Sequence, residues 1–106
     1  MSGWSWLGLA ALLEVAWSQS IKPTEGFTRP LPTLVCLLLF VAAVLPLSKA
    51  MQSLPVGTAY VVFTGVGGVG AVVLGIALSG DPLTALRVLG AALVVAGVVV
   101  LRVSGG

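Results

Sequence analysis

Residues 57–79, GTAYVVFTGVGGVGAVVLGIALS, contain no charged side chain and no proline. An α-helix needs about 20 mainly apolar residues to cross the hydrocarbon core of a bilayer. A segment of this length and composition is typical of a membrane-spanning helix. The character of the whole chain then depends on whether the flanking segments share this pattern.

Three further segments have the same apolar character, at about residues 4–21, 31–48 and 84–101. Short connections that contain proline or glycine separate the segments, and Thr84 or Asp81 can cap the last helix. Helices joined by short connections run up-down-up-down, so both termini lie on the same side of the membrane. The sequence therefore predicts an all-α membrane protein, a single transmembrane domain of four helices over the whole chain.

The composition excludes several classes of protein. The 106 residues are 58% hydrophobic and 8% charged, whereas about a quarter of the residues in a soluble domain are charged. This argues against a soluble enzyme, and five basic residues without a patch argue against nucleic acid as a partner. The chain has no histidine and a single cysteine, Cys36, so we expect no metal site. Nothing in the sequence indicates a cofactor.

The basic residues predict the orientation only weakly. Lys49 and Arg102 lie on the side of the termini, and Lys22, Arg29 and Arg87 lie on the other side. This difference is small for a positive-inside signal. Two interpretations stay open: a bias without meaning, or a chain that inserts both ways and can form antiparallel dimers. Because four helices enclose little interior, we expect at least a dimer.

Glu14 lies near the middle of the first segment and is the only acid within any of the four segments. A charge at that depth costs about 2.5 to 3.5 kcal/mol on insertion scales, and no basic side chain lies at the same depth. Such a carboxyl group can hold either a proton or a cation, which a proton-coupled cation carrier requires. The alternative is a protonated glutamate that only donates a hydrogen bond between helices.

Aromatic residues accompany this acid. Trp17 follows Glu14 at the third position, so both lie on one helix face, and a ring beside a carboxylate suits a cation. Tyr60 and Phe63 lie one turn apart on the third segment, and Tyr60 can hydrogen-bond Glu14 across helices. Trp17 can equally be an interfacial anchor, and Tyr60 can be a core aromatic.

Glycines mark the last two segments. Residues 65–70, GVGGVG, match a dinucleotide motif in form but lack the strand–turn–helix context. Gly65 and Gly67 indicate either a flexible helix that acts as a hinge or plain close packing. Gly90 and Gly97 are seven residues apart and form a small-residue seam, so we expect the last helix to serve assembly of the dimer.

The motifs together resemble the small multidrug resistance family over nearly the whole chain. The resemblance rests on Leu13-Glu14-Val15-Ala16-Trp17, Lys22, Gly26-Phe27-Thr28-Arg29, Leu54 to Tyr60, Thr64 to Gly67, Asp81-Pro82-Leu83 and the pair Gly90 and Gly97. Trp17, Lys22 and the Gly-Phe-Thr-Arg loop are most similar to the guanidinium-exporter subtype.

The resemblance implies an antiparallel, dual-topology dimer in the bacterial cytoplasmic membrane. It also implies proton/cation antiport, in which protons and substrate share the Glu14 residues of both subunits. Trp17 and Tyr60 would orient or hydrogen-bond that glutamate, and Gly65 and Gly67 would belong to a flexible third helix. The expected partners are protons, a small organic cation, the lipid bilayer and a second subunit.

Two residues depart from the guanidinium subtype, which usually has tryptophan where this chain has Phe63 and serine where it has Ala43. Both family residues belong to the hydrogen-bonded network around the central glutamate. A site without them should lose selectivity for a small polar cation. The departures favour one subunit of a heterodimeric pair, or a specificity shifted toward larger and more apolar cations.

The leading hypothesis is a proton-coupled exporter of small organic cations, guanidinium-like compounds first. One alternative is a polyspecific exporter of quaternary ammonium and aromatic cations, which Phe63 favours slightly. Another is an assembly or regulatory subunit that does not transport by itself. A channel would need more polar side chains along its pore, and an enzyme would need a nucleophile–base pair.

Overall fold

The computed structural model describes residues 2–104, which form four α-helices and one short 3₁₀ turn. The helices are α1, Gly3–Ile21; α2, Pro30–Ala50; α3, Val56–Leu78; and α4, Ala85–Val103, and the turn η1 covers Lys22–Thr24. The ranges predicted from the sequence differ from these bounds by at most two residues at either end.

Three helices, α2, α3 and α4, are long and apolar enough to cross a membrane. α1 has 19 residues but falls outside this group, because Glu14, Gln19 and three serines lower its hydropathy. Its position supports a fourth span all the same, since α1 packs against both α2 and α3. We therefore propose that α1 also crosses the membrane.

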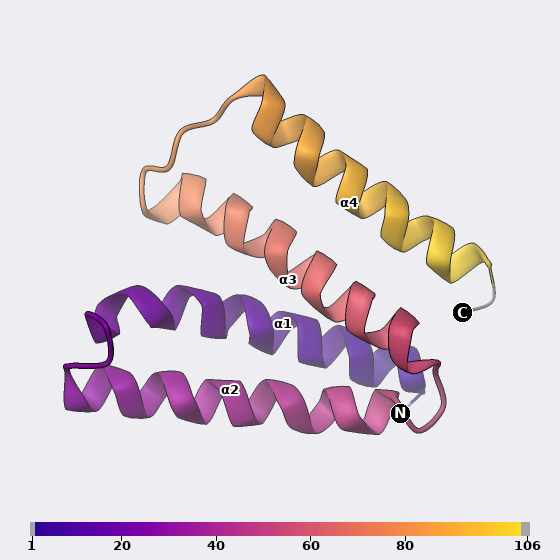
Figure 1. Cartoon of the computed structure of the whole chain (residues 1–106), viewed down its shortest axis with the longest axis horizontal. Coiled ribbons are helices and arrows are strands. Elements are labelled where there is room, and N and C mark those ends of the chain that lie inside the picture. The colour runs from indigo at the N-terminus through magenta and orange to yellow at the C-terminus, as the bar shows by residue number, and fades with distance from the viewer. Residues whose placement is uncertain (1, 105–106) are drawn as a thin grey trace.

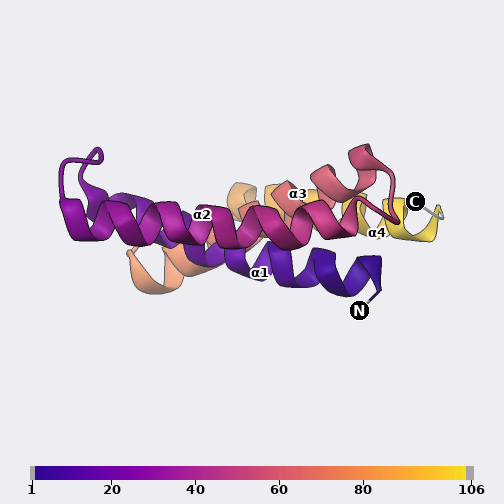
Figure 2. The same cartoon turned by 90° about the horizontal axis from the view of Figure 1, so that it is seen from below.

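The helices form a thin layer (Figure 1). α1 and α2 run antiparallel along each other, α3 crosses α1, and α4 packs against α3 on the side away from α2. Figure 2 shows the narrow edge of this layer, whose principal extents are 42 × 34 × 18 Å. The shortest extent is less than two helix diameters of about 10–12 Å, so one chain encloses almost no interior.

The first turn of α1 and the last turn of α4 lie at the same end of the layer, as the up-down-up-down prediction requires. There the Arg102 guanidinium lies 4.4 Å from the centre of the Trp4 ring, and the Lys49 ammonium lies 5.4 Å from the centre of the Trp6 ring. Cation–π contacts of this kind, at about 0.5–1 kcal/mol each, help to hold the helix ends together.

The apolar core lies toward this same end, where α1, α2 and α3 meet. Alanines at the contacts let the three backbones approach closely. Its buried members are Leu7, Ala10, Ala43, Leu47, Ala50, Ala59, Val62 and Phe63. α4 contributes no buried residue at all within the described part of the chain. The opposite end, where α3 leaves α1, is more open.

Candidate functional site

Glu14 faces α3 where α1 and α3 cross. Its Oε2 atom is buried and has no hydrogen-bond partner among residues 2–104. The carboxyl group lies directly over Gly67, since a Cβ atom at Gly67 would come within 2.8 Å of Glu14 Cδ and 3.1 Å of Glu14 Cγ. A buried charge without a partner is costly. Binding of a proton or a cation by this carboxyl group stays a prediction.

The glycines of α3 serve two neighbours. Gly70 lies against Val15 of α1, where an added Cβ would be 3.3 Å from Val15 Cβ. Gly65 faces α4 instead, where an added Cβ would lie 3.1 Å from Val94 Cγ1 and 3.3 Å from Val98 Cγ2. α3 stays α-helical throughout Val56–Leu78. The structure thus gives Gly65 and Gly67 a packing role, and the hinge stays a prediction.

Trp17 and Glu14 lean toward different helices. The Trp17 ring packs against Phe40 of α2, with ring centres 5.6 Å apart and planes at 54°. The Glu14 carboxyl group turns toward Gly67 of α3. Sequence reasoning did not single out Phe40, because a lone aromatic in a leucine-rich helix has no spacing that marks it.

Tyr60 lies on the surface of the single chain, with 55% of its area exposed. Among the hydrogen bonds of the described residues, none joins the Tyr60 hydroxyl to Glu14. Tyr60 is seven residues from Gly67, which corresponds to about 10 Å along the helix axis. A bond between Tyr60 and Glu14 therefore stays a prediction for the assembled protein.

Phe63 and Ala43 belong to the same apolar core. Phe63 is only 7% exposed and Ala43 only 2%. These are the two positions that the resemblance to the guanidinium subtype singled out. The chain thus has apolar packing where the resemblance leads us to expect polar groups.

Gly90 and Gly97 lie on open surface of α4. An added Cβ at either position would meet no atom within 4 Å. Gly90 lines an apolar groove of about 480 Å³ between α3 and α4, and Gly97 lines a second one of about 640 Å³. Both positions are accessible to another helix.

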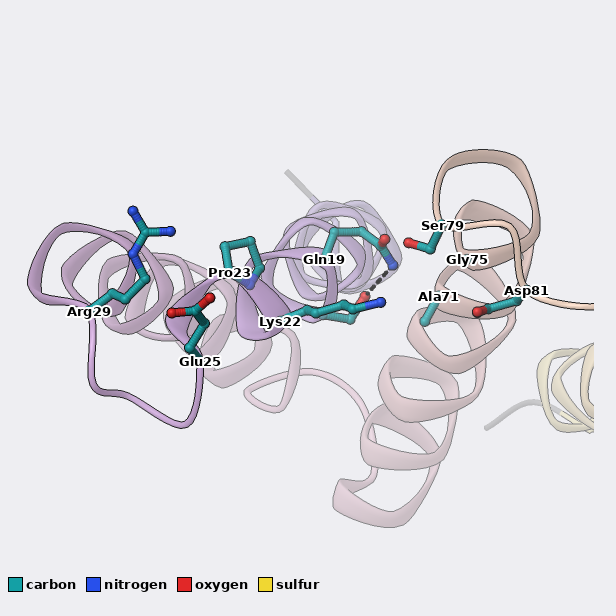
Figure 3. Close-up of a pocket in the computed structure, with 10 residues that line it drawn as sticks. Gln19, Lys22, Pro23, Glu25, Arg29, Ala71, Gly75, Ser79 and Asp81 are labelled. Atoms are coloured by element: carbon teal, nitrogen blue, oxygen red, sulfur yellow. Dashed lines mark hydrogen bonds between the residues drawn. The ribbon is translucent and has the colours of Figure 1, made fainter.

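A polar cavity of about 400 Å³ lies between the end of α1 and the second half of α3 (Figure 3). It begins one helical turn beyond the Glu14–Gly67 contact, because Ser18 follows Glu14 by four residues and Ala71 follows Gly67 by four. Its lining is Ser18, Gln19, Lys22, Pro23, Glu25, Arg29, Ala71, Gly75, Ser79 and Asp81. Most of these residues were not candidates from the sequence, because they come from separate segments of the chain.

Residues 2–94 match the sequence profile of the family described as Small Multidrug Resistance protein. The chain belongs to the small multidrug resistance family. The resemblance deduced from its motifs is thereby confirmed. As a member of this family with several membrane-spanning helices, it is a multi-pass membrane protein of the transporter class rather than an enzyme.

Relatives within the small multidrug resistance family cover almost the whole chain. The guanidinium exporters of Citrobacter freundii and Salmonella typhimurium are each 45% identical to it over 101 residues, which is 95% of this chain and 96% of the relative. The guanidinium exporter of Yersinia pestis is 43% identical over 101 residues, or 97% of its own length.

Proposed function

We propose that this chain exports small organic cations, guanidinium-like compounds first, across the bacterial cytoplasmic membrane in exchange for protons. The observation that carries the proposal is the buried Glu14 Oε2 atom without a partner at the crossing of α1 and α3. The guanidinium exporters among its bacterial relatives support the substrate class and the membrane.

The chemistry of one carboxyl group couples the two movements. A proton neutralises Glu14, and so does an organic cation paired with the carboxylate. One small site cannot hold both, so binding of one requires release of the other. A planar guanidinium group suits this site, because its parallel N–H donors match the two oxygens of a carboxylate.

A second subunit would complete the site. In one chain the layer is 18 Å thick, Tyr60 is half exposed and α4 has no buried residue. An antiparallel, dual-topology homodimer, or a heterodimer with a paralogous subunit, would cover these surfaces and place two Glu14 residues around a shared cavity. Trp17, Tyr60 and Phe63 would then surround the cation, and Gly65 and Gly67 would let α3 adjust.

A second candidate function is export of larger quaternary ammonium and aromatic cations. The apolar core at Phe63 and Ala43 favours it, because a wall without hydrogen-bonding groups discriminates poorly against apolar cations. Guanidinium and tetraethylammonium are the probes that separate the two candidates.

The test is the transport current of the purified chain in proteoliposomes on a solid-supported membrane. We expect guanidinium to evoke a current that Glu14→Gln abolishes. Glu25→Gln makes the same acid-to-amide change outside α1 and should keep the current. A guanidinium current that persists in Glu14→Gln would contradict the mechanism, and a current with tetraethylammonium alone would favour the second candidate.

A further inference from the structure

The polar cavity between α1 and α3 extends from the end of the layer to a point one helical turn from Glu14. Ser18 and Ala71 lie at its inner end, one turn from the Glu14–Gly67 contact, and Asp81 lies at its outer end in the connection between α3 and α4. A hydrated cation that approaches Glu14 between these two helices passes through this volume.

Opposite charges face each other across the cavity. In Figure 3 the Lys22 side chain extends from the end of α1 toward Ala71 and Asp81 on the α3 side. Glu25 and Arg29 lie farther out, beyond Pro23. Within residues 2–104, no ion pair closer than 4.0 Å forms between Lys22 and Asp81. Each charge therefore faces a space large enough for a small ion.

The backbone and side chain of Asp81 are held in place. The Asp81 N–H donates to the Gly75 carbonyl oxygen at 3.1 Å. The carboxyl group lies against Gly75, where an added Cβ would come within 3.3 Å of Asp81 Cγ. The absence of a side chain at Gly75 thus lets the Asp81 carboxylate fold back over α3 into the cavity.

The α1 side of the cavity offers polar atoms. The Gln19 Nε2 atom donates to Ser18 Oγ at 3.3 Å, and Ser18 Oγ donates to the Val15 carbonyl oxygen at 2.6 Å. This arrangement leaves the Gln19 side-chain carbonyl as an acceptor beside the cavity. A carboxylate on one wall and an amide oxygen on the other are acceptors that suit a small cation with several N–H groups.

We propose that this cavity is an outer binding station for the exported organic cation, in which Asp81 is the ligand and the Lys22 ammonium competes with that cation for it. The proposal rests on the proposed cation export and extends it to the approach route. With no cation present, the Lys22 ammonium faces Asp81 across the cavity without forming an ion pair, and its positive charge opposes the entry of another cation. A guanidinium is favoured over the ammonium at Asp81, because it makes two parallel hydrogen bonds where the ammonium acts as a point charge.

The proposal predicts effects of opposite sign for two variants. In guanidinium transport by the reconstituted full chain, Asp81→Asn should raise KM about three- to fivefold, the range expected for one partly exposed charge pair. Lys22→Gln should lower KM by about two- to threefold for the same reason. Both variants should keep kcat, because Glu14 still exchanges proton for cation.

Three controls make the result specific to Asp81. Glu25→Gln removes a negative charge from the outer part of the same cavity and should change KM less than twofold. Asp81→Glu should restore most of the wild-type KM. High salt should reduce the difference between Asp81→Asn and wild type, since exposed charges are screened. An unchanged KM in Asp81→Asn, shifts of the same sign in both variants, or an equal effect of Glu25→Gln would overturn the proposal.

A binding measurement separates this proposal from the export mechanism. In Glu14→Gln, titration with guanidinium should still shift the NMR signals of the Gln19 side-chain amide, and the added Asp81→Asn change should remove that shift. If wild type fails to transport but this shift is found, the station stands and the export proposal fails. If the shift is absent in Glu14→Gln, the cavity has no station of its own.

Discussion

At the scale of single residues, Gly67 provides the space that the Glu14 carboxyl group occupies. A methyl group in Gly67→Ala would force the end of the flexible Glu14 side chain to move, which costs little folding energy. Alanine also gains about 1 kcal/mol of helix propensity over glycine. We expect transport to fall more than tenfold while the free energy of unfolding changes by less than about 1 kcal/mol, as measured by proteoliposome currents and thermal unfolding in detergent.

Two neighbouring glycines serve as comparisons for this variant. Gly68 has no atom within 4 Å of an added Cβ, so Gly68→Ala should keep transport. Gly70 lies against the stiff, β-branched Val15, so Gly70→Ala should destabilise the protein by about 1–3 kcal/mol. Normal transport by Gly67→Ala would show that the carboxyl group does not work from the position seen here.

The burial of the Glu14 carboxyl group could be predicted from its place in an apolar segment, but its surroundings could not. The glycines of α3 are visible in the sequence, whereas the assignment of Gly67 to α1 and Gly65 to α4 depends on how the helices cross. The same limit applies to Trp17. It follows Glu14 by three residues on α1, but its ring packs against Phe40 of α2. Crossing angles arise from packing along whole helices, which no short motif encodes.

At the scale of helices, α4 depends on its N-terminal cap more than the other helices do, since it has no buried residue. Thr84 Oγ1 accepts a hydrogen bond from the Arg87 N–H at 3.2 Å, which confirms the predicted cap. Thr84→Ala should cost about 1 kcal/mol, because that N–H loses its partner. We expect about fivefold faster hydrogen exchange at the Arg87 amide, measured by NMR in detergent micelles.

Thr84→Ser keeps the hydroxyl group and should keep the slow exchange. Amides in the middle of α1 and α2 should not change in either variant. Equal exchange at Arg87 in Thr84→Ala and wild type would mean that the cap does not stabilise α4.

The helix bounds could be predicted from the sequence, because the length of an apolar segment and the prolines and glycines that flank it act locally. Among the helices of residues 2–104, α1 alone is not apolar enough by itself to count as a membrane-spanning helix.

At the scale of the whole molecule, the open face of α4 is where we expect the second subunit to pack. A Cβ added at Gly97 meets no atom of its own chain within 4 Å, and the groove beside it has room for a larger side chain, so Gly97→Leu should leave the fold of the single chain intact. The same side chain should block close approach of a partner helix. We expect the variant to be monomeric, by light scattering in detergent, with unchanged helix content by circular dichroism.

Val99→Phe adds bulk on the opposite side of α4, where Val99 is 53% exposed, and should keep the dimer. A dimeric Gly97→Leu would place the contact between subunits elsewhere.

The dimer could be proposed from the sequence only as a property implied by the family and from the small size of the bundle. The surfaces available to a partner could be identified only from the structure, in which the layer of helices leaves them exposed.

The close packing of α1 along α2 also has a consequence for biosynthesis. α1 precedes α2 in the chain and is less apolar than α2, α3 and α4, the three helices that are apolar enough to cross a membrane. It is therefore poorly suited to enter lipid by itself. Paired with α2, it covers part of its surface with protein, while the Glu14 carboxyl group stays uncovered until α3 packs over it. The two helices should therefore leave the translocon as one hairpin, and α3 should close over Glu14 in a later step.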